Sequence, residues 1–426
     1  MIQMNVRIKS ENHHNIDVIL DRLKEITKLE IDNKITYHSL EYFQLEWMLL
    51  SLIEINYSIS IEMVKEILRN SIRQLAIANN YSKNYLVEQL SANINNHLRK
   101  SESTYILLSA ISIKNLPFRK LKIGSVEIEI HGKQYPKLFR QHREDIYIKR
   151  RFQKENQDYA KVSIKIRSRD YKDAFEKAIE VLEVFRSLLC LILNSQYEIR
   201  FDELSPKPIN EVLLAEVLSL HYENGACPNA DYFHFVQNYK EVSSHVLIEQ
   251  SRTNLRKNIL WLVRQYNNCK PKHQKLIQKA LNLYVSAFDE CDKFLCFTRA
   301  WTVLEILTAT DQKDLMIKRC ISLFNHDVKP LDKQMLECLR QYRNEYVHEG
   351  YNSLDPLTAC FSIQRFIYFL IVNFNLKYAG SFDNINEANL FLDNYTVDLK
   401  DLKTRRRIID RILSVKNMSE NRHPKL

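Results

Sequence analysis

The sequence predicts a mainly α-helical protein with a small α/β module in its middle. Only five glycines occur in 426 residues, far below the average share of about 7%, and this favours helices over turn-rich β structure. Apolar residues recur three and four positions apart through most of the chain, as they do on one face of a helix. Between residues 101 and 205 this period gives way to the alternation of strands. A chain of this length also exceeds what one hydrophobic core usually supports, so we expect several domains.

Residues 1–100 are expected to form a helical N-terminal module. Helical periodicity runs over residues 15–28, 37–55, 61–79 and 83–98. In the first of these segments the apolar stripe consists of Ile16, Ile19, Leu20, Leu23 and Ile26. Because this spacing places the five side chains on one face, we expect them to form part of a core.

Residues 101–205 are expected to form the small α/β module. Strand-like patterns occupy residues 105–113, 121–130 and 162–167, and residues 197–201 are a fourth candidate. A helix is predicted over residues 170–193. In the third strand Val162, Ile164 and Ile166 alternate with polar residues, which predicts one buried and one solvated face. Prolines at 206 and 208 and the irregular stretch 223–230 indicate a boundary near residues 205–230.

Basic and aromatic residues are interleaved between residues 133 and 169. The basic cluster Lys149, Arg150 and Arg151 is the densest part, and Tyr147 and Phe152 flank it. This mixture suits single-stranded RNA, because phosphates bind cations and bases stack on aromatic rings. The alternative is a solvated hairpin whose aromatic rings pack inward, and the sequence favours neither.

Residues 206–400 are expected to form a helical bundle, followed by a basic helix or tail at 401–426. Helical periodicity covers residues 242–265, 274–288, 291–308, 316–324, 332–348 and 357–377. The last segment carries Arg405, Arg406 and Arg407 beside Ile408 and Ile409. Such a helix either binds nucleic acid or covers the core.

Composition excludes several classes of function. Neither glycine-rich phosphate-binding motif of the nucleotide enzymes occurs, so ATP hydrolysis and hydride transfer are not expected. The net charge of +10 favours polyanionic partners. Eight cysteines without paired zinc-ribbon spacing indicate reduced, buried thiols rather than a metal site, and no cofactor is expected.

Localisation follows from the apolar segments. The first residues lack the apolar stretch of a secretory signal, and the runs near residues 188–193 and 366–374 are shorter than a bilayer requires. We therefore expect a cytosolic protein without a membrane partner.

The most chemically specific segment is residues 341–350, which contains Arg343, Asn344 and His348. Asn344 and His348 are four apart and share a face of a helix. Arg343 and His348 are five apart, hence about 140° around the axis and about 7.5 Å along it. Three arrangements bring them together: the Arg343 side chain curls back, the helix loosens before Gly350, or a second copy of the chain completes the site.

This pattern resembles the signature of the HEPN superfamily, in which Arg, a polar residue and His recur at this spacing. The segment 294–307, including Trp301 and Glu305, resembles the helix that precedes the motif in the ApeA-like branch. The resemblance covers residues 270–380 and implies a dimerising helical bundle. It further implies a metal-independent endoribonuclease of bacterial toxin and anti-phage systems, with Arg343, Asn344, His348 and Glu305 in the active site. Gly350 stands where a related branch has Tyr, so that branch's antitoxin partner is not carried over.

In such a ribonuclease the ribose 2′-OH attacks the adjacent phosphorus. His348 would serve as acid or base, and Arg343 would stabilise the charged phosphate oxygens. Asn344 would hold His348 or touch the phosphate. Glu305 would hold Arg343 by a charge-assisted bond, or it forms an ordinary salt bridge of its helix. Each chain brings one such His, so a homodimer is expected to supply both proton transfers. A phage-derived trigger is a further expected partner. The rival interpretations are a non-catalytic sensing or dimerisation module and a basic nucleic-acid-binding regulator.

Overall fold

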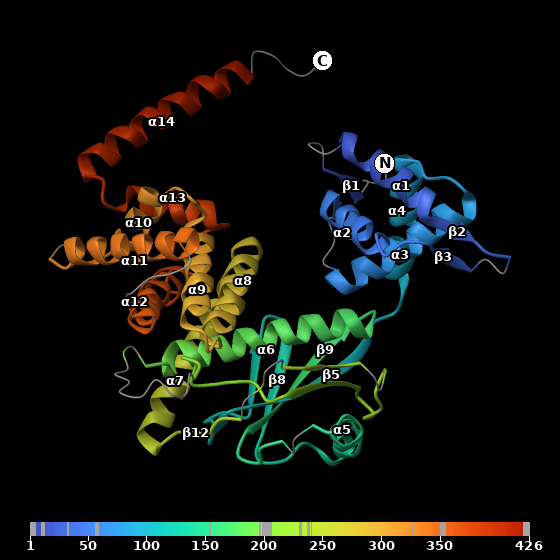
Figure 1. The fold of residues 1–426 in the computed structure, drawn as a ribbon. Helices are drawn as coiled ribbons and strands as arrows, with labels where there is room; N and C mark the ends of the chain where they lie inside the picture. Colours follow the sequence, from blue (N-terminus) through green and yellow to red (C-terminus); the bar gives the residue numbers. More distant parts are fainter. Residues whose placement is uncertain are drawn as a thin grey trace.

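The computed structural model describes residues 6–9, 13–31, 34–55, 59–152, 155–195, 197, 207–229, 232–236, 239, 241–324, 327–349 and 355–420. For residues 13–15, 313, 347–349 and 417–420 it describes the main chain alone. The described residues form 14 α-helices and a small sheet module, with about 60% of the chain helical. The predicted fold class is therefore confirmed. The sheet lies in the middle, and Figure 1 shows helical parts above both ends of its long helix α6.

The N-terminal module packs four helices around its own core. These are α1 (His13–Ile26), α2 (Tyr42–Leu52), α3 (Ile61–Ala78) and α4 (Lys83–Arg99). The predicted stripe from Ile16 to Ile26 is buried in this core. The module also contains two short antiparallel ribbons, β1 (Val6–Ile8) with β4 (Ile53–Ile55) and β2 (Thr27–Leu29) with β3 (Ile35–Tyr37). The helix predicted over 37–55 is therefore too long, because β-branched residues at both ends pair as strands.

Six antiparallel strands form the sheet, in the order β11-β10-β5-β9-β8-β7. Their bounds are β5 Ser103–Ile111, β7 Lys120–Ile123, β8 Val126–His131, β9 Ala160–Ser168, β10 Val217–Tyr222 and β11 Phe233–Phe235. The single strand predicted over 121–130 is in fact a hairpin. It turns at Gly124, whose φ of +59° suits glycine.

The sheet continues beyond the boundary expected near residue 205. Strands β10 and β11 pair with β5 and with each other, so residues 217–235 belong to the same sheet. Two further short strands, β6 (Ile113–Lys114) and β12 (His245–Val246), pair in parallel beside it. Tyr197 lies in no strand, and residues 198–201 of the fourth candidate strand lie outside the described residues.

Helices cover both faces of the sheet. On β5, Tyr105, Leu107 and Ile111 join the core beneath α6 (Tyr171–Leu193). The alternate residues Ile106 and Leu108 face the other way, against Tyr135 and Phe139 at the start of α5. Helix α5 (Lys137–Arg150) was not predicted, since its buried stripe is only Phe139, Arg143 and Ile146. Residues 137–150 of the interleaved basic segment are thus a helix on the sheet and not a hairpin. The aromatic rings do pack inward as that alternative expected, since Tyr135, Phe139 and Tyr159 are buried.

The C-terminal bundle shares one continuous core with the sheet. Its helices are α7 (Glu249–Asn268), α8 (Pro271–Phe288), α9 (Lys293–Thr308), α10 (Lys313–Ile321), α11 (Lys329–Glu349), α12 (Pro356–Tyr368), the π-helix η2 (Phe369–Leu376) and α13 (Ile385–Tyr395). The buried residues of this core run from Tyr105 to Leu392. The sheet module and the bundle are therefore packed as one hydrophobic unit.

Helices α12 and η2 together form one apolar segment, Pro356–Leu376, of 21 residues. It is long and apolar enough to cross a bilayer, so the expectation that the run near residues 366–374 is too short for this is wrong. However, 61% of its apolar window is buried inside the protein. Such burial is typical of the core helix of a soluble protein, and among the described residues no second helix meets the same criterion.

The last helix, α14 (Leu399–Glu420), stands apart from the bundle (Figure 1). Its apolar side chains Ile408, Ile409, Ile412 and Leu413 are each about half exposed. Of the two roles considered for this segment, covering the core is therefore wrong, because these side chains do not pack on it.

Candidate functional site

The motif residues Arg343, Asn344 and His348 all lie on α11, which is α-helical from Lys329 to Glu349. Loosening of the helix before residue 349 is therefore not how Arg343 and His348 meet. The Arg343 Nη1 atom donates to Asn344 Oδ1 at 3.4 Å, so the structure brings these two side chains together. The His348 side chain lies outside the described residues. Its main-chain position places it on the helical face of Asn344.

Aromatic contacts fix this part of α11 against the start of α9. The Phe294 ring stacks on Tyr346 and on Tyr342, with centroid separations of 4.6 Å and 5.9 Å. The Phe297 ring meets Tyr342 edge-on at 5.0 Å. Asp292 caps α9 by accepting from the Phe294 and Leu295 amides. Motif residues 343 and 344 thus lie on a helix turn whose neighbouring rings are anchored.

Glu305 does not hold Arg343. Its carboxylate accepts a hydrogen bond from Trp301 Nε1 at 3.0 Å, within its own helix. The motif turn packs on Phe294, at the opposite end of α9. Glu305 lies about three turns, or roughly 16 Å, further along the axis. The expected charge-assisted bond is therefore absent from the described contacts, and Glu305 serves instead as the acceptor of a buried indole.

The predicted nucleic-acid-binding residues of the sheet module lie at the end of α5. Lys149 and Arg150 occupy its last turn, and Arg151 is the C-cap, in left-handed conformation with φ of +57°. All three side chains are exposed. The Arg150 guanidinium lies 5.4 Å from the centre of the Phe233 ring on β11. A cation and an aromatic ring therefore lie side by side on this surface, an arrangement that suits a single-stranded nucleic acid.

The second predicted group, Arg405, Arg406 and Arg407, lies on the exposed helix α14. Arg405 donates to Asn394 at 2.8 Å, and Arg406 lies 3.9 Å from Asp410. Exposed pairs of this kind contribute little stability and leave the arginines accessible. Figure 1 places α14 and α5 at opposite ends of the molecule, so the two basic groups do not form one surface within a single chain.

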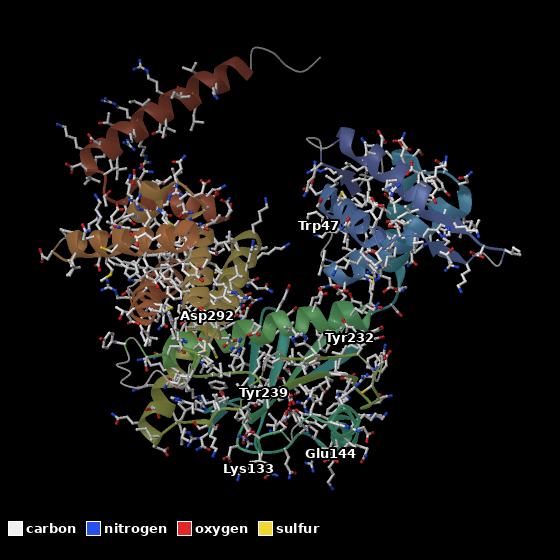
Figure 2. All side chains as sticks on the ribbon, viewed as in Figure 1. Trp47, Lys133, Glu144, Tyr232, Tyr239 and Asp292 are labelled. Atoms are coloured by element: carbon white, nitrogen blue, oxygen red, sulfur yellow. The ribbon has the colours of Figure 1, made fainter. Side chains whose placement is uncertain are left out.

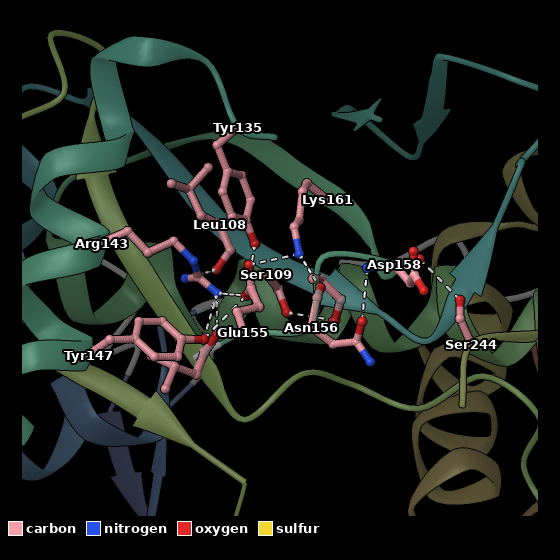
Figure 3. A network of polar contacts seen from close by, with 12 residues as sticks. Leu108, Ser109, Tyr135, Arg143, Tyr147, Glu155, Asn156, Asp158, Lys161 and Ser244 are labelled. Carbon is pink, nitrogen blue, oxygen red and sulfur yellow. Dashed lines mark hydrogen bonds and ion pairs between the residues drawn. The ribbon is translucent and has the colours of Figure 1, made fainter. Parts of the chain in front are cut away.

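A buried polar cluster in the sheet module was not predicted as a site. Its centre is Glu155, whose carboxylate accepts from Arg143, Tyr135 and Tyr147 through one oxygen. The other oxygen lies 3.0 Å from the Lys161 ammonium. Figure 3 shows these side chains converging from the segment before α5, from α5 itself, from the loop after it and from β9. The same residues belong to the basic and aromatic segment seen in the sequence, but only the fold brings their side chains together.

Burial and neighbouring charges shift the pKa values within this cluster. Burial alone would raise the pKa of Glu155, but Arg143 and Lys161 outweigh it and lower that pKa. For Lys161 burial dominates, and its pKa falls despite the Glu155 carboxylate. Burial likewise raises the pKa of Tyr135, so this phenol stays protonated and donates its hydrogen bond. The Glu155 carboxylate and its cationic partners thus lie next to one another, shielded from solvent.

Arg143 also connects the cluster to a buried histidine. Its Nη1 atom donates to Ser219 Oγ at 3.0 Å, and that oxygen lies 3.0 Å from His221 Nε2. The other ring nitrogen of His221 lies 3.3 Å from the Gly225 carbonyl oxygen, which can only accept. The Nδ1 atom of His221 therefore carries a proton, which it donates to this carbonyl. Burial lowers its pKa to about 4.

The eight cysteines are all free, and five of them are buried, as predicted: Cys190, Cys269, Cys296, Cys320 and Cys360. The prediction of buried thiols is wrong for the other three, because Cys227 and Cys291 are half-buried and Cys338 is exposed. Comparison of the chain with family models, with curated proteins and with solved structures finds no match in any of the three. A function for this protein must therefore be inferred from the chemistry of its residues.

Proposed function

We propose that this protein is a HEPN-type endoribonuclease that cleaves RNA without a metal or cofactor and acts in the cytoplasm as an effector of bacterial anti-phage defence. The observation that carries the proposal is the placement of the motif. Arg343 and Asn344 are in contact on α11, and His348 follows one turn later on the same helix. A permanent cation, an amide and an imidazole are the groups that 2′-OH attack on a phosphodiester needs.

Each residue has a distinct part in the proposed reaction. His348 takes the proton of the 2′-OH or gives one to the departing 5′-oxygen. Arg343 stabilises the negative charge that grows on the phosphate oxygens. Asn344 orients the imidazole or binds the phosphate. The products are a 2′,3′-cyclic phosphate and a 5′-hydroxyl, so the atoms balance without an added reactant.

A homodimer supplies the second imidazole in this proposal. Within one α-helix, Arg343 and His348 point about 140° apart, and α11 keeps α-helical geometry through both residues. Two copies of α11 facing each other across a two-fold axis would bring the arginine of one near the histidine of the other. We propose that a phage-derived signal controls this arrangement. We also propose that the RNA substrate is bound by Lys149, Arg150 and Arg151 at the end of α5 and by Arg405, Arg406 and Arg407 of α14.

Purified protein tests the proposal. Wild type and His348→Ala are incubated with single-stranded RNA in EDTA, and His38→Ala is the matched control because His38 is exposed in the distant N-terminal module. Lys333→Ala is the matched control for Arg343→Ala, because Lys333 is an exposed cation of the same helix. We expect cleavage by wild type and both controls and none by the two motif variants.

The rival functions give different results in the same assay. A basic nucleic-acid-binding regulator binds duplex DNA equally well with or without His348 and cleaves nothing. A sensing module cleaves no RNA before or after phage infection. Cells carrying wild type and His348→Ala are therefore also infected, and their RNA is analysed. Intact RNA in every one of these samples contradicts the proposal.

A further inference from the structure

A pocket of about 790 Å³ opens between α5, the loop that follows it and the start of β9. This volume is within the range of small-molecule sites. A neighbouring pocket of about 610 Å³ shares Lys133, Tyr135 and Arg140 with it. The buried Glu155 cluster forms the floor, and Figure 2 places Lys133 and Glu144 at the solvent-facing end of the module.

The charges lining this pocket are predominantly positive. Five cations line it, against the two carboxylates Glu144 and Glu155: Lys133, Arg140, Arg143, Arg151 and Lys161. Glu155 is already occupied by the cations and phenols of the floor. Lys133 and Arg151 are exposed. Lys133 lowers the pKa of Asp158, a carboxyl outside this pocket that pairs with Lys114 at 2.6 Å. The pocket therefore presents positive charge that its own carboxylates do not neutralise.

Two buried donors are also left over. An ammonium has three N–H groups, and Lys161 uses two of them, on Glu155 at 3.0 Å and on the Asn156 carbonyl at 2.7 Å. The Nε atom of Arg143 is buried and has no hydrogen-bond partner among the described atoms. Unpartnered buried donors are costly, which favours binding of an acceptor-rich anion nearby.

Aromatic rings extend from the pocket to the edge of the sheet. Tyr147 and Phe152 line the pocket, with their ring centres 6.2 Å apart. Phe152 continues to Phe233 and Phe235 on the edge strand β11, at 5.7 Å and 5.9 Å. Cations beside a surface of aromatic rings suit a nucleotide, because the phosphate binds the cations and the base stacks on the rings.

We propose that this pocket binds a nucleotide by its terminal phosphate. Lys133, Arg151 and the remaining N–H of Lys161 contact the phosphate, and the base lies against Tyr147 and Phe152. The phosphate monoester comes either from a free nucleotide or from the 5′ end of an RNA. The site is separate from the α11 motif. It shares Arg151 with the basic cluster at the end of α5, and it does not depend on whether the protein cleaves RNA.

Calorimetric titration of the full-length protein tests this site. The protein carries His348→Ala, and the RNA probes are 2′-O-methylated tetranucleotides, so that cleavage cannot interfere. Three probes are used: AMP, a 5′-phosphorylated tetranucleotide and the same tetranucleotide with a 5′-hydroxyl. The test variant combines Lys133→Ala with Arg151→Gly, because glycine accepts the left-handed conformation at 151 without strain. The control is Lys137→Ala, an exposed cation of α5 outside the pocket.

We expect the double variant to bind at least about tenfold more weakly, since two charge-assisted hydrogen bonds are lost, and the control to bind like its parent. If AMP binds tightly and the 5′-phosphorylated RNA does not, the ligand is a free nucleotide. Tighter binding of the 5′-phosphorylated RNA than of AMP identifies an RNA end. The proposal is overturned if no probe binds, if the double variant binds like its parent, or if the 5′-hydroxyl RNA binds as tightly as its phosphorylated form. Unchanged melting temperatures of the unliganded variants exclude a folding defect.

Discussion

His221 shows how a single buried side chain couples stability to pH. Its ring is fully buried and its Nδ1 proton is directed to the Gly225 carbonyl. Protonating Nε2 would remove the acceptor that faces Ser219, beside the permanent charge of Arg143. Burial, assisted by Arg143 and His142, therefore holds the pKa of His221 near 4. The unfolded chain binds this proton at the ordinary pKa of about 6.5.

From this difference we predict that stability falls as pH decreases from about 6.5 toward 4, because the unfolded state binds a proton that the folded state refuses. Between pH 7 and pH 5 wild type should lose about 2 kcal/mol more than His221→Gln. Urea unfolding followed by circular dichroism measures both proteins. The four other histidines with lowered pKa, His97, His131, His234 and His273, contribute equally to both and cancel. Equal losses for wild type and variant would disprove the assignment.

Glu305 is a second residue whose role the structure changes. Its bond from Trp301 predicts that Glu305→Ala lowers the free energy of unfolding by about 1 kcal/mol, since the indole N–H loses its acceptor. RNA cleavage at a temperature where both proteins are folded should stay unchanged. Glu305→Gln keeps an acceptor and should retain the stability as well. A variant with normal melting and abolished cleavage would restore Glu305 to the active site.

At the scale of elements, the sequence predicted long amphipathic helices well and mixed or irregular ones poorly. Helix α6 begins within one residue of its prediction, because Asp170 caps it and its apolar stripe is continuous. Helix α5 was missed because a buried arginine, Arg143, takes one place in its inward stripe. The hairpin at Gly124 was read as one strand because apolar alternation continues across the turn. Strand pairing and tertiary burial determined the structure of these segments, and neither can be deduced from the local sequence.

Helix α14 allows a prediction about RNA binding. Its exposed arginines should contribute to RNA affinity chiefly through phosphate contacts. Replacing Arg405, Arg406 and Arg407 by Ala should reduce the slope of log K against log salt concentration by about 2. Fluorescence anisotropy with a labelled single strand, carried out with the His348→Ala protein, measures this slope. The control replaces three exposed cations of the N-terminal module, Lys24, Lys28 and Lys34. An equal change in both proteins would mean that only net charge matters.

At the scale of the molecule, α6 joins the parts. Its carboxylates cap the first turn of α3: Asp173 accepts from the Ser60 amide at 2.9 Å, and Glu176 accepts from the amides of Ile61 and Glu62. The N-terminal module has its own hydrophobic core, separate from the core that the sheet and bundle share. This attachment therefore depends mainly on polar contacts and not on a continuous core.

We predict that Glu176→Ala loosens the N-terminal module without unfolding the rest. Two amides at the start of α3 lose their acceptor, and trypsin should then cut faster after Arg99 or Lys100, where the module joins β5. Glu180→Ala is the matched control, since Glu180 lies one turn along α6 and accepts from Gln278 instead. Mass spectrometry of the fragments follows the cut. Equal rates for both variants would show that this contact does not hold the module.

The candidate sites differ in how far the sequence could define them. Arg343, Asn344 and His348 lie within one turn and a half of a helix, so their spacing is readable directly. The Glu155 cluster draws on Tyr135, Arg143 and Lys161, and its outer support, Ser219, lies 76 residues from Arg143. Only the pairing of β10 with β5 brings these together, and sheet pairing over that distance has no local signal. The residues that a second copy would contribute to the α11 site likewise cannot be deduced from the sequence of one chain.

Attack by the ribose 2′-OH, with His348 as acid or base, can be tested directly by the chemistry of cleavage. An RNA oligonucleotide and its fully 2′-O-methylated counterpart are incubated in EDTA with wild type and with His348→Ala, and the products are weighed by mass spectrometry. We predict that wild type cuts only the unmodified RNA and leaves a 2′,3′-cyclic phosphate, whereas His348→Ala cuts neither. Cleavage of the methylated RNA, or equal cleavage by the variant, would contradict the account.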